Sequence, residues 1–221
     1  MKHRIVLIAS LLMLSLCVSA KKVKVTIDGT LSPTQTKYYL IIDEDTAHAV
    51  RLPINDGKFS ITVKVDANSF IRLHDTKDWP ERSVFVLIPD SRHISINTWT
   101  GNIEGSPMSQ KLYDMLNLVR RAGPEGFHID VFSDDKEAWA QARETEKRIR
   151  AGMEQEQREI AYQVVNDNSN NIIPAWVVYC YPELFEDRLP MFLKDKPKWA
   201  KHPILLKRKK ISAYLNDYIY R

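Results

Sequence analysis

Apolar and polar residues alternate through the first half of the chain, from Val23 to Glu104. Because side chains on a strand point to opposite faces in turn, each alternating run predicts a strand with one buried face. The runs are VKVTID, YYLIID, FSITVKV, SFIRLHD, SVFVLI and HISIN. Asp56-Gly57 predicts a tight hairpin turn, since Gly tolerates the positive φ that such a turn requires. Roughly six to eight short strands without an inserted helix predict an antiparallel sandwich or small barrel over residues 21–105.

The spacing changes from strand to helix at Ser106-Pro107. Ser is a favoured N-cap, and Pro suits the first helical position, where no amide donor is needed. The helix that starts there is predicted to end at Gly123-Pro124. Apolar residues recur at helical spacing from this point onward, so residues 106–221 are predicted to form an α-helical subdomain. The expected fold class is therefore α+β.

A long second helix is predicted from Asp134 to about Val165, with Glu137 completing a capping box. One apolar seam runs along it, formed by Trp139, Ala142, Ile149, Met153, Ile160 and Val164. Glu146 and Glu156 interrupt this seam. We therefore favour a helix packed along one stripe over the alternative of a two-stranded coiled coil.

Three further segments complete the helical half. IIPAWVVYCY predicts a short, deeply buried helix, and ELFEDRLPMFLKD predicts an irregular apolar connection. A last helix is predicted after His202-Pro203, with Ile204, Ile211 and Leu215 on its apolar side.

Residues 1–20 have the order of a secretory signal peptide: basic residues, an apolar run, then Val18-Ser19-Ala20 as a cleavage site. The apolar run is shorter than the roughly 20 residues that span a bilayer, and no second such run follows. The chain is thus expected to be exported, to the periplasm or cell envelope. Lipidation at Cys17 is the less favoured alternative, because the bulky Leu16 precedes it.

Cleavage after Ala20 leaves 30 basic and 28 acidic residues and Cys180 as the single cysteine. This near-neutral balance, together with export, argues against a nucleic-acid binder. A lone Cys180 forms no internal disulfide and lacks the second thiol of a thiol reductase, so we interpret it as a buried core residue. The sequence contains no metal-ligand spacing, phosphate loop or serine-hydrolase elbow. We therefore predict no catalytic residue, metal site or cofactor.

The end of the chain is basic, with the run Lys207, Arg208, Lys209 and Lys210. One interpretation is contact with an anionic surface, such as lipid or glycan phosphates. The alternative, which we favour, is that the basic last helix packs beside the acidic long one.

The order of several short motifs resembles a known family. Ile27-Asp28-Gly29, Tyr39-Leu40, Asp56-Gly57-Lys58-Phe59 and Gly105-Ser106-Pro107 follow one another as in the N-terminal accessory domain (domain of unknown function 4369) of exported thioredoxin-like (TlpA-like) proteins of Bacteroidota. NDNSNNIIPAWVV and His202-Pro203 are similar to the helical connector of the same proteins. In those relatives a thioredoxin domain with Cys-x-x-Cys follows the connector, and this chain has none.

The resemblance carries no catalytic residue over to this chain. The leading hypothesis is therefore an exported cell-envelope binding or interaction module without catalytic activity, with a protein partner in the envelope. The alternative is an accessory component of periplasmic thiol–disulfide exchange that acts with a separate thioredoxin-like protein. An enzyme whose site assembles from residues distant in the sequence is the third.

Overall fold

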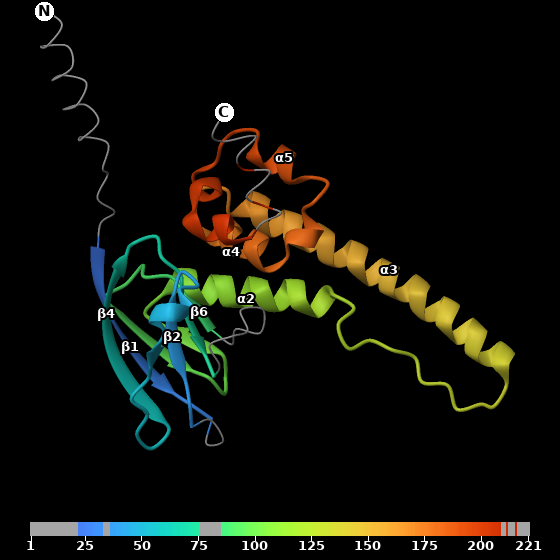
Figure 1. The fold of residues 1–221 in the computed structure, drawn as a ribbon, viewed down its shortest axis with the longest axis horizontal. Coiled ribbons are helices and arrows are strands. Elements are labelled where there is room, and N and C mark those ends of the chain that lie inside the picture. The colour runs from blue at the N-terminus through green and yellow to red at the C-terminus, as the bar shows by residue number, and fades with distance from the viewer. Residues whose placement is uncertain (1–21, 33–35, 76–84, 209–210, 212–214, 216–221) are drawn as a thin grey trace, which may run out of the picture.

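The structure is a computed structural model that describes residues 22–32, 36–75, 85–208, 211 and 215 (Figure 1). The predicted signal peptide, residues 1–20, lies outside the described residues. Strands form the first part of the chain and helices the second, which confirms the predicted α+β class.

The strands form two four-stranded sheets. Each of the six predicted runs overlaps one strand. The first sheet has the order β4-β1-β7-β8, with β1 (Lys22–Thr30), β4 (Lys58–Asp66), β7 (His93–Asn97) and β8 (Asn102–Glu104). The second has the order β3-β2-β5-β6, with β2 (Tyr39–Ile42), β3 (Val50–Arg51), β5 (Ile71–His74) and β6 (Phe85–Leu87). A short 3-10 helix, η1 (Thr46–His48), precedes β3.

The two sheets form a sandwich and not a closed barrel within the described part of the chain. Apolar residues from both sheets share one core, among them Ile27 of β1, Leu73 of β5 and Ile94 of β7. One pairing departs from the antiparallel prediction, because β1 and β7 run parallel from Thr26–His93 onward. These strands are distant in the sequence, so no hairpin turn fixes their relative direction.

The second half contains α2 (Pro107–Ala122), α3 (Lys136–Asp167), α4 (Ile173–Cys180) and α5 (Leu189–Leu193), with 3-10 helices η3 (Pro182–Leu184), η4 (Lys198–Lys201) and η5 (Pro203–Lys207). Ser106 caps α2 as predicted, since its Oγ accepts a hydrogen bond from the Ser109 amide at 3.2 Å. Asp135 caps α3, one residue later than predicted. The connection predicted as irregular contains η3 and α5. At the start of the predicted last helix the structure has η5, which ends in extended backbone at Arg208; of the residues after it, only Ile211 and Leu215 are described, and both are helical.

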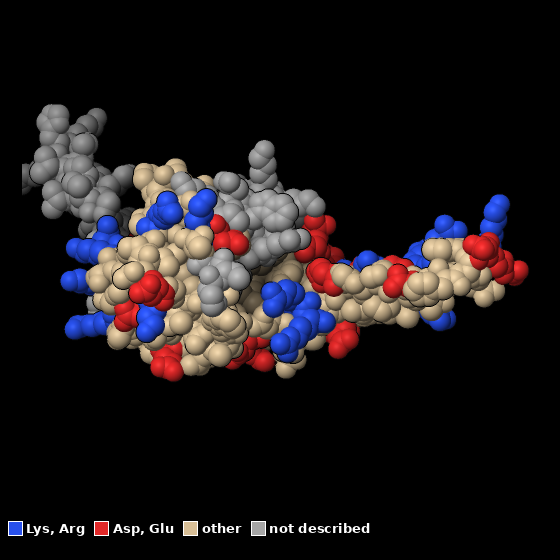
Figure 2. Space-filling view, turned by 90° about the horizontal axis from the view of Figure 1, so that it is seen from below, with Lys and Arg blue, Asp and Glu red and all other residues tan. Residues whose placement is uncertain are grey.

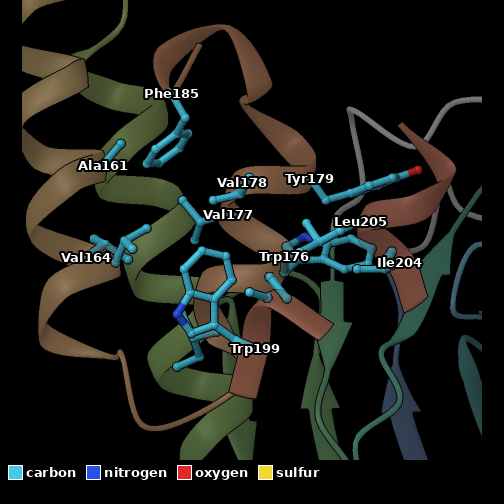
Figure 3. Packing of buried hydrophobic residues seen from close by; sticks show 14 of the residues in the cluster. Ala161, Val164, Trp176, Val177, Val178, Tyr179, Phe185, Trp199, Ile204 and Leu205 are labelled. Atoms are coloured by element: carbon cyan, nitrogen blue, oxygen red, sulfur yellow. The ribbon is translucent and has the colours of Figure 1, made fainter. Parts of the chain in front are cut away.

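Helix α4 lies at the centre of the helical core, where Trp176 and Val177 are buried against Trp199 and Leu205 (Figure 3). Phe70, at the start of β5, also belongs to this core, and its ring centroid lies 4.9 Å from that of Trp176. The second sheet is thus covered on both faces, by the first sheet and by the helices. Each large apolar side chain buried here contributes roughly 1.5–3 kcal/mol, so the two halves stabilise each other.

The apolar seam predicted along α3 is packed only near the end of the helix. Of its six residues only Val164 is buried, and the first buried side chain of α3 is Gln157. Residues 136–156 project from the body of the molecule (Figure 1). The prediction of a helix packed along its whole stripe is therefore wrong for this first part, because nothing in the described chain lies over it except an extended segment.

Candidate functional site

The outer face of the β4-β1-β7-β8 sheet is lined by polar side chains. Alternation places the core residues of these strands inward, and the residues between them point away from the sandwich. Strand pairing then aligns these residues in rows across the sheet: Thr62, Thr26 and His93 in one row, Ser60, Asp28, Ser95 and Glu104 in the next, and Lys58, Thr30, Asn97 and Asn102 in the last.

Asp28 is the centre of this face. Its carboxylate accepts hydrogen bonds from the hydroxyl of Ser60 and from Nε2 of His93. These bonds favour the charged form, so the bond from Ser60, followed by the one from His93, lowers the pKa of Asp28. In the adjacent row the hydroxyls of Thr26 and Thr62 are bonded at 2.9 Å. The face therefore presents fixed donors and acceptors with charges of both signs.

An open hollow of about 700 Å³ lies on this face, at the end of the sheet where the Asp56-Gly57 turn is found. It is lined by Asp28, Gly29, Thr30, Pro53, Asn55, Asp56, Lys58, Phe59, Ser60 and Ser95. The hairpin turn predicted from Asp56-Gly57 forms one of its walls, with φ of 48° and 70° at these two residues. The hollow is large enough for a polar ligand of several rings.

An exposed aromatic residue lies beside the end of β1. The side chain of Trp99 is 63% exposed, and its indole N–H donates to the carbonyl oxygen of Leu31 at 3.1 Å. The Oδ1 atom of Asn97 accepts the amides of Trp99 and Thr100 and so fixes the turn that carries the indole. Trp99 thus offers a rigid aromatic surface next to the last polar row.

The serine, histidine and aspartate on this face do not form a catalytic triad. A triad needs the imidazole between the serine and the carboxylate, so that it takes the serine proton. Here Ser60 and His93 both bond to the carboxylate of Asp28. Among the residues that the structure describes, no group of three or more His, Cys, Asp or Glu side chains is arranged to hold a metal ion. The arrangement is suited to holding a ligand by hydrogen bonds.

Cys180 is the last residue of α4, and it is half-buried where full burial was predicted. It packs against the helical core between two tyrosines. Burial is the largest cause of the raised pKa values of both neighbours, and it raises the pKa of Tyr179 to about 12. The thiol therefore lies in an apolar setting that is not fully closed to solvent.

The basic run at 207–210 is only partly described. Lys207 is exposed. Arg208 is half-buried, its Nε donates to the Tyr179 carbonyl oxygen at 3.1 Å, and its guanidinium lies 4.8 Å from the centre of the Tyr179 ring. The side chain of Arg208 thus packs against α4. Lys209 and Lys210 lie outside the described residues.

Two buried polar arrangements between the sheet and the helices were not predicted. Arg72 of β5 is bound by Glu44, and His202 bonds the carbonyl oxygen of Asn68. Alternation alone would place Arg72 on the solvent side of β5, because Ile71 and Leu73 on either side of it face the sandwich core. The helical half covers this second face, which only the tertiary structure reveals.

Within the described residues, no helix has both the length and the apolar character needed to cross a membrane. Comparisons with protein-family models, with curated proteins and with solved structures give no match for this chain.

Proposed function

We propose that this chain is an exported binding module of the cell envelope, of the accessory type found in thioredoxin-like proteins. It holds a polar, hydroxyl-rich ligand, such as a glycan strand, on the outer face of the β4-β1-β7-β8 sheet. We infer export from residues 1–20, which have the order of a signal peptide. We infer the family type from the motifs between Ile27-Asp28-Gly29 and Gly105-Ser106-Pro107.

The observation that carries this proposal is the difference between the two sheets. The β3-β2-β5-β6 sheet is covered on both faces, whereas no helix of the described chain covers the outer face of the β4-β1-β7-β8 sheet. This outer face keeps a hollow beside Asp28, whose carboxylate is held in place by two hydrogen bonds. Groups fixed before binding lose little conformational entropy when a ligand arrives.

The side chains of this face suit a ligand that carries hydroxyl groups. Asp28 accepts hydrogen bonds, Lys58 donates them, and Ser95 does both. All three residues lie on regular strands, so a flat ligand can approach their side chains. Exposed aromatic rings such as that of Trp99 pack against the apolar faces of sugars while the polar groups bind their hydroxyls.

The test is a calorimetric titration of the purified chain with soluble oligosaccharides prepared from bacterial envelope glycans. Asp28→Ala combined with Ser95→Ala is expected to weaken binding at least tenfold, because a lost hydrogen bond to a charged group costs about 1.5–3 kcal/mol. Lys64→Ala, on the outer face but outside the hollow, is the matched control and should bind like the wild type. Absence of glycan binding by the wild type, or unchanged binding by the double variant, would contradict the proposal.

The alternative, an accessory role in thiol–disulfide exchange with a thioredoxin-like partner, draws on one observation. Cys180 is half-buried, so a partner that loosens the end of α4 would expose its sulfur. The chain after Ala20 has no second cysteine to resolve a mixed disulfide, so any exchange requires a second protein. We regard this as the second candidate.

A further inference from the structure

Strand β4 is a long edge of the sandwich. Each sheet has two edge strands, and three of these four are short, with three residues in β8, two in β3 and three in β6. β4 has nine residues, and its register with β1 is unbroken from Lys58 to Asp66. Proteins usually shorten, bend or cover such an edge, because its unpaired backbone groups pair readily with another chain. The length of β4 therefore requires an explanation.

Pairing with β1 determines which backbone groups of β4 remain open. The Leu31 amide donates to the Gly57 carbonyl oxygen at 2.7 Å, so these two residues form a hydrogen-bonded pair of the antiparallel ladder. Bonded and non-bonded pairs alternate, so the odd-numbered residues of β4 direct their backbone groups toward β1 and the even-numbered residues direct theirs outward. Lys58 shows the outward direction, because its amide and its carbonyl oxygen bond with Asn55 at 2.9 and 2.8 Å.

Residues 60–64 of β4 form what we call the open edge. Within the described chain, no group bonds to the outward amides and carbonyl oxygens of its even-numbered residues, Ser60, Thr62 and Lys64. Asn55 closes the open edge at one end. At the other end the chain turns away, since the Ser69 amide donates to the Asp66 carbonyl oxygen at 2.9 Å. Figure 1 shows β4 at the margin of the sandwich, away from α3.

The inner side of the open edge is apolar. Ile61 and Val63 pack against the sandwich core and are only half-buried. A neighbouring strand would cover the parts of these side chains that face solvent. Opposed β-branched and other apolar side chains on adjacent strands stabilise a sheet. An added strand is thus expected to place apolar side chains opposite these two residues.

The outer side of the open edge is basic. The charged residues that point outward from β1 and β4 are four lysines and two aspartates: Lys22, Lys24, Lys58, Lys64, Asp28 and Asp66. Lys64 lies directly opposite Lys24, and like charges in this position destabilise a sheet. Within the described chain neither lysine has an ion-pair partner. Figure 2 shows basic side chains along this margin of the molecule, so an acidic neighbour would be favourable.

We propose that the open edge accepts an extended segment of a partner protein as an added antiparallel strand. The segment carries acidic residues opposite Ser60 and Lys64. It carries apolar residues opposite Ile61 and Val63, because directly opposed side chains share one face of the sheet. Backbone hydrogen bonds supply the affinity, and the alternating side chains supply the specificity. The antiparallel direction is favoured because its ladder is slightly more stable for each residue.

A second copy of β4 does not suit this edge. Two β4 strands use all their outward groups only when Thr62 of one copy pairs with Thr62 of the other. That register places Asp66 of one copy opposite Lys58 of the other, where Asn55 already occupies the edge. A short segment, or the end of a chain, avoids this collision. The occupant is therefore a segment of a different protein.

The probe is a fluorescently labelled peptide that contains the sequence Glu-Val-Thr-Val-Glu, and fluorescence anisotropy measures its binding. Thr62→Pro removes the central outward amide but keeps the ladder with β1, since proline is tolerated where an edge strand faces solvent. It is expected to weaken peptide binding roughly tenfold, because a hydrogen bond is lost and its acceptor on the peptide is left unpaired. Thr62→Ala loses the same hydroxyl but keeps the amide, so this matched control should bind like the wild type.

A charge exchange tests the direction of the added strand. In antiparallel order the first Glu of the peptide lies opposite Lys64. Lys64→Glu is thus expected to weaken binding of this peptide and to bind a peptide with Lys-Val-Thr-Val-Glu more tightly than the wild type does. A peptide with Glu-Val-Thr-Val-Lys should not regain binding to this variant. If it does, and the first exchange peptide does not, the antiparallel arrangement is wrong.

Amide hydrogen exchange locates the bound peptide. The outward amides of Ser60, Thr62 and Lys64 should exchange faster than those of Ile61 and Val63 in the chain alone, and the peptide should slow all three. Absence of saturable peptide binding by the wild type would overturn the proposal. So would equal binding by Thr62→Pro and Thr62→Ala, or protection of the outward amides by raised protein concentration without peptide.

The peptide experiment is independent of the proposed glycan binding. Thr62 and Lys64 do not line the hollow beside Asp28, so the same variants should bind oligosaccharide like the wild type. Circular dichroism establishes that each variant keeps its fold. If Thr62→Pro does not fold, Lys64→Glu with the two exchange peptides still decides the matter.

Discussion

The carboxylate of Glu44 holds the guanidinium of Arg72 in two hydrogen bonds, Nε to Oε1 at 2.5 Å and Nη2 to Oε2 at 2.9 Å. The side chain of Arg72 is 0% exposed and that of Glu44 is 5% exposed. Glu44 lies in a turn where both it and Asp43 have positive φ, 59° and 47°. Such φ values are unfavourable for residues other than Gly, so the turn is held by its buried bonds, including one from the Phe70 amide to Asp43 at 2.8 Å.

Substituting Glu44→Gln is expected to lower the free energy of unfolding by about 3–5 kcal/mol, because it removes the carboxylate charge that balances a buried guanidinium. The neighbouring Asp45→Asn, whose bond to His48 is exposed, should change the free energy of unfolding very little, because exposed ion pairs contribute little to stability. The double variant Glu44→Met with Arg72→Met should be more stable than Glu44→Gln. Urea unfolding measures all three variants, and equal losses for Glu44→Gln and Asp45→Asn would contradict the prediction.

His202 makes the docking of the C-terminal segment sensitive to pH. Nε2 donates to the Asn68 carbonyl oxygen at 2.6 Å, so Nδ1 is the atom that accepts the Ile204 amide at 3.2 Å. This fixes the neutral imidazole, since a proton on Nδ1 removes the acceptor. Burial is the largest cause of the lowered pKa of His202, and the bond to Asn68 and the charge of Asp43 oppose it.

A histidine with a lowered pKa takes up its proton more readily in the unfolded chain. Its contribution to stability is therefore complete above the ordinary pKa of 6.5 and is lost as pH falls from there through the folded pKa. We expect urea unfolding to show this loss between neutral and mildly acidic pH. His202→Ala should reduce the slope, and His48→Ala, at an exposed position, should keep it. An unchanged slope in His202→Ala would exclude His202 as its source.

Two glycines should respond in opposite ways to alanine. A Cβ atom at Gly29 would lie 2.0 Å from the ring of Phe59, which is buried in the sandwich. Gly29→Ala is thus expected to destabilise the fold by about 1–3 kcal/mol. Gly152 lies within α3 with nothing within 4 Å, so Gly152→Ala should stabilise by about 0.5–1 kcal/mol through helix propensity. Thermal unfolding of both variants tests the pair, and a lower midpoint for Gly152→Ala would contradict it.

The setting of Cys180 predicts slow thiol chemistry. Cys180 is half-buried at the end of α4 and packs against the helical core, so a reagent has limited access to its sulfur. The native chain is expected to react with a thiol reagent much more slowly than the urea-unfolded chain and to show no insulin reductase activity. Turnover of insulin that disappears in Cys180→Ser would support the thiol-exchange alternative over the binding module.

The outer face of the β4-β1-β7-β8 sheet could be predicted from the sequence only in part. Alternation indicated that Asp28, Ser60 and Ser95 each point away from a buried face, because that depends only on immediate neighbours in the chain. It did not indicate that they lie in one row. That row results from the antiparallel pairing of β1 with β4 and the parallel pairing of β1 with β7, which join segments far apart in the sequence.

The sequence by itself determined six of the eight described strands, the Asp56-Gly57 turn, the change to helix at Ser106 and the approximate ends of α2 and α3. These features follow from alternation, capping and turn chemistry, which act over a few residues. Only the tertiary structure decided that both faces of β5 are buried, so that Arg72 requires Glu44. The tertiary structure also decided that the apolar seam of α3 is buried at Val164 and exposed to solvent at Trp139. An apolar pattern shows that a face can be buried, but what covers it depends on contacts between distant segments.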